Sequence, residues 1–116
     1  PKPTIGVEVE LFIVSSDTFN LCSGAPLILK AFPESQHIKE ELLECIVEVN
    51  TDICQDVSEV RSDLTSRIAE VRQVANKENM ALISMGTHPF ALWKAQTITQ
   101  SNRYINFLER YTKLFI

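Results

Sequence analysis

The sequence predicts an α+β fold, in which helices pack on one face of a mainly antiparallel sheet. The first observation is that aliphatic residues alternate along residues 5–14 as they do in a strand with one core face. The second is a stripe of apolar residues at helical spacing over residues 56–79. The third is the order of the expected elements: strand, long connection, strand, helix, strand, helix. A length of 116 residues fits one domain.

Composition and charge bear on the class of partner. The net charge of −4 disfavours nonspecific nucleic-acid binding, which needs a basic surface, and it disfavours docking on anionic membranes. No apolar run approaches the roughly 20 residues that span a bilayer. We therefore expect neither a nucleic acid nor a membrane as a partner.

The three cysteines, Cys22, Cys45 and Cys54, are an odd number without close pairing. We expect three reduced thiols, with Cys45 packed in the core. The polar start of the chain, residues 1–4, also lacks the pattern of a signal peptide. Both observations predict a cytoplasmic protein.

Both ends of the sequence are unusual. The chain begins without Met and ends in the apolar run Leu114-Phe115-Ile116, whereas natural C-termini are usually exposed and polar. We expect residues 1–116 to be a single piece of a larger protein.

The first expected strand covers residues 5–14. One face consists of Ile5, Val7, Val9, Leu11 and Ile13, and the other of Gly6, Glu8, Glu10, Phe12 and Val14. Residues 15–18 are short and polar and predict a turn, after which residues 19–22 return as a short strand. Residues 23–36 contain one glycine and two prolines and predict an irregular connection.

A second strand is expected from about residue 42 to residue 50. The first half of this segment is compatible with a helix, but the β-branched run Ile46-Val47-Glu48-Val49 favours a strand. In a strand, Glu44, Ile46 and Glu48 share one face. The other face then carries Leu43, Cys45, Val47 and Val49.

The clearest helix is expected over residues 56–79. Asp56 and Glu59 have the spacing of a capping box. The apolar stripe consists of Val57, Val60, Leu64, Ile68, Val71 and Ala75. A short strand follows at residues 80–85, and then a loop at residues 86–90.

A final amphipathic helix is expected over residues 100–114, with Ser101 as its N-cap. Its inward residues are predicted to be Tyr104, Phe107, Leu108 and Tyr111.

Glu8 and Glu10 are the first candidates for chemistry. They lie on one strand face, about 6.6–6.8 Å apart along the chain. Two carboxylates on an inner strand are unfavourable unless something compensates their charge, and a divalent cation with hard oxygen ligands, such as Mg²⁺ or Mn²⁺, does so. The alternative is a solvated sheet face, which the pattern alone favours.

Glu44 and Glu48 repeat this arrangement on the second strand. If the two strands are neighbours, the carboxylates converge and repel one another without cations. His88, in the loop after a buried strand, is a candidate for metal or phosphate contact, although a lone histidine is more often part of a turn. For Arg103, the ordinary interpretation from the sequence is an arginine that forms an ion pair on the surface. No phosphate-binding glycine loop, dinucleotide fingerprint or zinc-spaced set is present.

Four segments together resemble a known family. Residues 6–12 resemble its first strand, with the pattern G-x-E-x-E-x-F, and residues 41–51 its second strand, which ends in E-x-x-T. The loop Gly86-Thr87-His88-Pro89-Phe90 and the later Trp93 and Arg103-Tyr104 follow in the same order. The family is the bacterial carboxylate–amine ligases of the second glutamate–cysteine ligase type, and the resemblance makes this chain an N-terminal fragment.

This resemblance implies a partial glutamine-synthetase-like sheet whose carboxylates bind Mg²⁺ (or Mn²⁺) and ATP. It implies an ATP-dependent ligase that activates glutamate, or a similar carboxylate, as an acyl phosphate. An amine such as that of cysteine then attacks. By motif the metal ligands are Glu8, Glu10 and Glu48. Glu41 is a further candidate that needs a bend, because its parity along the strand differs from that of Glu48.

The resemblance also implies that His88 and Arg103 lie on the nucleotide or substrate side of the site. The family continues with a further strand of the H-V-H-V-G kind, which residues 1–116 do not contain. We therefore expect the fragment alone to be inactive and to self-associate through open strand edges and apolar surface. The alternative is a non-catalytic interaction or oligomerisation module that retains the fold.

Overall fold

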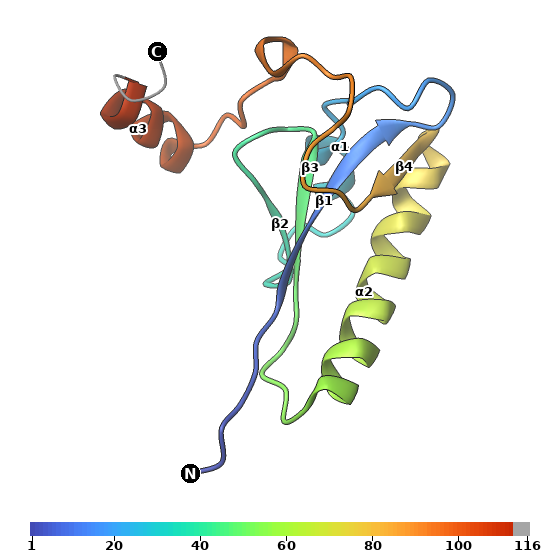
Figure 1. Ribbon diagram of the computed structural model, residues 1–116, viewed down its shortest axis with the longest axis vertical. Coiled ribbons are helices and arrows are strands. Elements are labelled where there is room, and N and C mark those ends of the chain that lie inside the picture. Colours follow the sequence, from blue (N-terminus) through green and yellow to red (C-terminus); the bar gives the residue numbers. More distant parts are fainter. Residues whose placement is uncertain (113–116) are drawn as a thin grey trace.

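The computed structural model describes residues 1–112 and contains a four-stranded antiparallel sheet with the strand order β2-β3-β1-β4 (Figure 1). The strands are β1 (Glu8–Ser15), β2 (Ile38–Glu40), β3 (Ile46–Asn50) and β4 (Met80–Ile83). This arrangement confirms the predicted α+β class and the antiparallel sheet.

The helices are α1 (Ala25–Leu29), α2 (Val57–Lys77) and α3 (Asn102–Tyr111), with a short 3₁₀ helix, η1, at Trp93–Ala95. α1 and α2 pack on one face of the sheet, whereas α3 stands away from that layer (Figure 1). The core between the sheet and the helices contains Leu11, Ile13, Val47, Val49, Ala25, Ile28, Val71 and Ala75. Burial of these aliphatic side chains is the main force that stabilises this layer. No helix within residues 1–112 is long and apolar enough to cross a bilayer.

β1 is a central strand, because it pairs with β3 on one side and with β4 on the other. It begins at Glu8, later than predicted, since Ile5 makes only an isolated bridge to Cys54. Leu11 and Ile13 are buried on the predicted core face. Val14, on the opposite face, is also fully buried, and Leu21 bridges to it. The predicted return strand at residues 19–22 is therefore reduced to this one bridge.

The connection predicted to be irregular, residues 23–36, contains α1, so that prediction was wrong. Pro26 does not prevent a helix here, because proline is compatible with the first helical turn, where its missing N–H has no intrahelical partner. Gly24 precedes α1 and packs against the core. A Cβ at residue 24 would lie 2.4 Å from Met80 Sδ and 2.8 Å from Ile13 Cγ2.

The second predicted strand, residues 42–50, is wrong in its first half. Only Ile46–Asn50 is β3, and a separate short strand, β2, precedes it. The residues between them turn the chain, and Leu43 in that loop bridges to Ile98. The strand assignment of the β-branched half is confirmed, and Val47 and Val49 are fully buried as predicted.

α2 confirms the expected helix and its cap. Asp56 is the N-cap, and its Oδ1 accepts a hydrogen bond from Glu59 N at 2.9 Å, which satisfies one of the free N–H groups of the first turn. Asn79, with φ of 55°, follows the helix in the left-handed conformation typical of helix ends. Val57 belongs to the predicted apolar stripe but is 70% exposed, because it lies at the first turn beyond the packed layer.

The C-terminal helix is partly as predicted. Ser101 is the N-cap, although its side chain makes no capping hydrogen bond, and Tyr104 is buried. Phe107 was predicted to point inward but is 40% exposed, because α3 does not lie on the sheet. The predicted helix end at residues 113–114 falls outside the described residues. All three cysteines are free, as expected, and Cys45 is in the buried interior.

Candidate metal site

Two of the predicted carboxylates are direct neighbours across the sheet. Glu10 of β1 and Glu48 of β3 are Cα partners in the antiparallel register, and Glu8 is opposite Asn50. Because side chains alternate along strands, these four residues project from the same face. This face is opposite to the one that α1 and α2 cover, so the carboxylates point away from the main core.

Glu41 reaches the same face by a chain reversal. It follows the last residue of β2, and the β2–β3 register places Lys39 opposite Glu48. Glu41 is two residues beyond Lys39 and therefore shares its parity. If Glu41 and Glu48 were on one strand, as the family resemblance implies, a bend would be needed to bring them to one face. In the structure they are instead on two consecutive antiparallel segments. The pairing of Lys39 with Glu48 therefore brings the side chains of Glu41 and Glu48 to the same face of the sheet.

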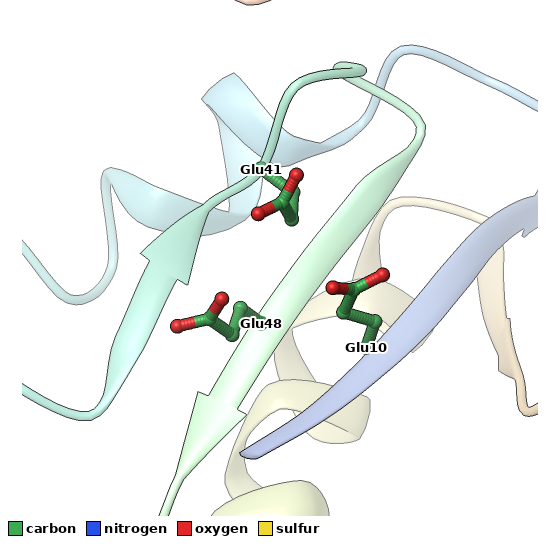
Figure 2. Close-up of side chains that lie close together, drawn as sticks. All are labelled: Glu10, Glu41 and Glu48. Atoms are coloured by element: carbon green, nitrogen blue, oxygen red, sulfur yellow. The ribbon is translucent and has the colours of Figure 1, made fainter. Parts of the chain in front are cut away.

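Glu10, Glu41 and Glu48 form a cluster that we call the carboxylate triad. Each offers one carboxylate oxygen, and the three oxygens lie within 4.8 Å of one another (Figure 2). This upper limit is roughly twice the cation–oxygen distance of 2.0–2.6 Å in Mg²⁺ and Ca²⁺ sites, so one cation between the three oxygens can contact all of them. The donor set of three hard, anionic oxygens therefore fits a divalent cation such as Mg²⁺ or Mn²⁺.

The electrostatics of the triad favour a bound positive charge. Burial raises the pKa of Glu10, and the negative charges of Glu41, Glu48 and Glu8 raise it further, in that order. Each of these influences disfavours the ionised carboxylate. A cation between the carboxylates would reverse the effect of the neighbouring charges.

Two residues hold the loop that contains Glu41: Thr99, which precedes α3, and Tyr104, which is in α3. Thr99 Oγ1 donates a hydrogen bond to the carbonyl oxygen of Glu41, and Thr99 N donates to Leu42 O at 2.9 Å. The Tyr104 hydroxyl lies 3.3 Å from Glu40 O and 3.5 Å from Glu41 Oε1. Burial, followed by the charge of Glu41, raises the pKa of Tyr104. No sequence motif indicates that Thr99 is part of this arrangement.

Glu8 is outside the triad. Its cross-strand partner is the neutral Asn50, and it lines a polar pocket together with His37, Lys39 and Asn50. The predicted role of Glu8 as a metal ligand stays a prediction, since within residues 1–112 the converging group of oxygens contains Glu10, Glu41 and Glu48.

His88 is buried and bonded to the backbone through both ring nitrogens. Nδ1 accepts from Ala91 N at 3.1 Å, and Nε2 lies 2.8 Å from Phe19 O. Since Nδ1 accepts, the proton belongs on Nε2, which donates to the carbonyl. His88 therefore ties the loop after β4 to the turn after β1, and among the described residues it is not part of the converging donor set. Its predicted nucleotide or substrate contact stays a prediction.

Arg103 lines the same pocket as Glu41, one member of the triad. Its guanidinium lies 5.2 Å from the centre of the Tyr104 ring, a cation–π arrangement. Together with Glu41, Leu42 and Phe107, these residues line a pocket of about 250 Å³. The structure thus brings Arg103 next to one member of the triad, and its predicted role in nucleotide or substrate binding stays a prediction.

Comparison with known proteins agrees with the resemblance seen in the sequence. Residues 4–114 match the family model described as "Glutamate-cysteine ligase family 2". A protein of Mycobacterium sp. strain KMS, named "Putative glutamate--cysteine ligase 2-1", is 37% identical over 110 residues, which is 95% of this chain and 29% of that protein. Relatives from Mycobacterium bovis and Mycobacterium tuberculosis are 36% identical over the same shares of both chains.

The chain thus spans about 29% of the length of the curated relatives that it matches. The family match, in contrast, covers nearly all of the chain, including the three segments that carry the triad and the loop that contains His88. This chain belongs to glutamate–cysteine ligase family 2.

Proposed function

We propose that this chain supplies part of the metal and nucleotide site of an ATP-dependent carboxylate–amine ligase that joins glutamate, or a similar carboxylate, to an amine such as that of cysteine. The observation that carries the proposal is the carboxylate triad, in which three separate segments of the chain bring their oxygens within 4.8 Å. Membership of the family and the names of the relatives support the ligase reaction.

In the proposed reaction an oxygen of the γ-carboxylate of glutamate attacks the γ-phosphorus of ATP, which forms an acyl phosphate and releases ADP. The amine then attacks the acyl carbon, loses a proton and displaces inorganic phosphate, which leaves the amide. A bound Mg²⁺ or Mn²⁺ would neutralise the phosphate oxygens during this transfer. The chain contributes fixed negative charge at a defined position. Glu10 and Glu48 project from paired strands, whereas Glu41 is on a loop fixed by Thr99 and Tyr104. Preorganised ligands of this kind keep the geometry of a site without rearrangement.

Metal titration tests the proposal. Mn²⁺ binding to the chain is measured by calorimetry at pH 7, with Mg²⁺ as a competitor. We expect Glu10→Gln and Glu48→Gln each to weaken Mn²⁺ binding at least tenfold, about 1.4 kcal/mol, because each removes one anionic ligand. Glu70→Gln, on the exposed surface of α2, is the control for the loss of one charge. Equal affinities in all four proteins would contradict the proposal and favour a non-catalytic interaction module.

Turnover requires more than the triad. Because the chain spans 29% of its relatives' length, we expect residues 1–116 alone to give no ATP-dependent ligation of glutamate and cysteine. Ligation by the purified chain, measured as phosphate release that depends on both amino acids, would contradict this expectation.

Sedimentation of the same sample tests the predicted self-association of the chain. A monomer at all concentrations would contradict that prediction.

A further inference from the structure

Asn50 is a buried polar residue at the end of β3, next to the triad. It is 8% exposed, and its side chain shares the sheet face of Glu48. Its Nδ2 donates a hydrogen bond of 2.8 Å to Glu48 Oε1. Its main-chain N–H is used separately, since it donates to His37 O at 2.7 Å. The side-chain bond to Glu48 is therefore additional to the bonds that hold the backbone of β3.

The orientation of the Asn50 amide follows from its partner. An ionised carboxylate only accepts hydrogen bonds, so the NH₂ group faces Glu48 and the carbonyl oxygen faces away. Among the described residues, that buried oxygen, Oδ1, has no hydrogen-bond partner. A buried acceptor without a partner destabilises a folded protein. An apolar side chain of the same size would avoid this penalty, so stability alone does not account for an asparagine at this position.

The neighbours of Glu48 act on it in opposite directions. On β1 it faces Glu10, which repels it, and on β2 it faces Lys39, whose positive charge attracts it. Without a restraint, both forces favour rotation of the Glu48 carboxylate away from Glu10. A hydrogen bond from the Asn50 amide, on the same strand, holds one oxygen of that carboxylate in place.

We propose that Asn50 is a positioning residue of the carboxylate triad, which fixes the Glu48 carboxylate in the arrangement needed for cation binding. This inference rests on the proposed function, because it assumes that the triad binds a cation. Residues that orient metal ligands typically change metal affinity 10–100-fold when they are replaced.

The test replaces Asn50 by a side chain of similar size without a donor. We expect Asn50→Leu to weaken Mn²⁺ binding on the order of tenfold, while the thermal midpoint of the metal-free chain stays the same or rises. A purely structural asparagine would behave differently, because its loss would lower the thermal midpoint. Unchanged Mn²⁺ affinity, or a lowered midpoint together with weakened binding, would overturn the inference. If Asn50→Leu does not fold, Asn50→Ala is measured against the same criteria.

A second measurement needs no metal. In the ¹⁵N-correlated NMR spectrum of the metal-free chain, we expect the side-chain amide signal of Asn50 to move when Glu48 is replaced by Ala. It should not move in the Glu70→Gln control. An unmoved signal in Glu48→Ala would show that the Asn50–Glu48 contact is absent and would overturn the inference.

The Mn²⁺ titrations distinguish failure of the proposed function from failure of this inference. If the unmodified chain binds no Mn²⁺, both fail. If the chain binds Mn²⁺ with an affinity that Asn50→Leu does not change, this inference alone is overturned.

Discussion

Glu10 and Glu48 face each other directly across β1 and β3, with carboxylate oxygens within 4.8 Å. Like charges in directly opposed positions of an antiparallel pair are unfavourable. The backbone hydrogen bonds that pair β1 with β3 do not require charged side chains at this position. The stability of the metal-free chain and its affinity for cations are therefore expected to respond in opposite directions to changes at this pair.

Neutralising one member of the pair should stabilise the metal-free chain. We expect Glu10→Gln to raise the free energy of unfolding by about 0.2–1 kcal/mol at pH 7, because the repulsion from Glu48 is removed. Urea denaturation in the presence of EDTA measures this change. Glu70→Gln is the matched control and should leave the free energy of unfolding nearly unchanged. A loss of stability in Glu10→Gln would contradict the expected repulsion.

The stability of the metal-free chain should also depend on pH through Glu10. Its folded-state pKa is raised from the ordinary value of 4.5, so the folded chain binds the proton more tightly than the unfolded chain. The resulting stabilisation is fully present below pH 4.5 and is lost as the pH rises through the raised pKa. Urea denaturation across this range should show that the loss is smaller in Glu10→Gln. Identical pH profiles for both proteins would exclude Glu10 as the source.

Glu8 provides a test of which carboxylates matter within this chain. It is on the same face as Glu10 but faces Asn50 and is outside the triad. We expect Glu8→Gln to change Mn²⁺ affinity less than about threefold, or roughly 0.7 kcal/mol, compared with at least tenfold for Glu48→Gln. Calorimetric titration of both variants makes the comparison. Equal losses would show that Glu8 is a ligand, as the sequence motif predicts.

The contact between Tyr104 and the Glu41 loop should contribute to stability. We expect Tyr104→Phe to lower the free energy of unfolding by about 0.5–1.5 kcal/mol, because the hydroxyl near Glu40 O is removed while the ring is kept. Tyr111→Phe, on the same helix, is the control. Chemical denaturation measures both variants, and an equal effect in the two would contradict a specific role of the Tyr104 hydroxyl.

Gly24 should not tolerate a side chain. A methyl group at residue 24 would meet Met80 Sδ at 2.4 Å and Ile13 Cγ2 at 2.8 Å, so the core must shift. We expect Gly24→Ala to lower the free energy of unfolding by about 1–3 kcal/mol. Gly86→Ala is the control, since nothing lies within 4 Å of its Cβ position. Thermal denaturation of the two variants should therefore differ clearly, and a similar midpoint would contradict tight packing at Gly24.

Features that depend only on residues close together in the chain were predicted correctly. These features are the alternation along β1, the β-branched half of β3, and the apolar stripe and N-cap of α2. Each is visible within a short stretch of sequence, so it can be predicted without knowledge of the fold. The motifs that carry the family resemblance are equally local. For the same reason, Glu8 and Glu10 were correctly placed on one strand face.

Which of these carboxylates become neighbours depends on the three-dimensional fold. The register that opposes Glu10 to Glu48, and the reversal that brings Glu41 to the same face, arise from backbone pairing between segments far apart in the chain. The contact of Tyr104 with Glu41 has the same origin, whereas Asn50 is only two residues from Glu48 on β3. A one-residue shift in register would move a whole strand's side chains to the other face. Local periodicity therefore fixes which residues share a face, whereas non-local hydrogen bonding fixes which of them become neighbours.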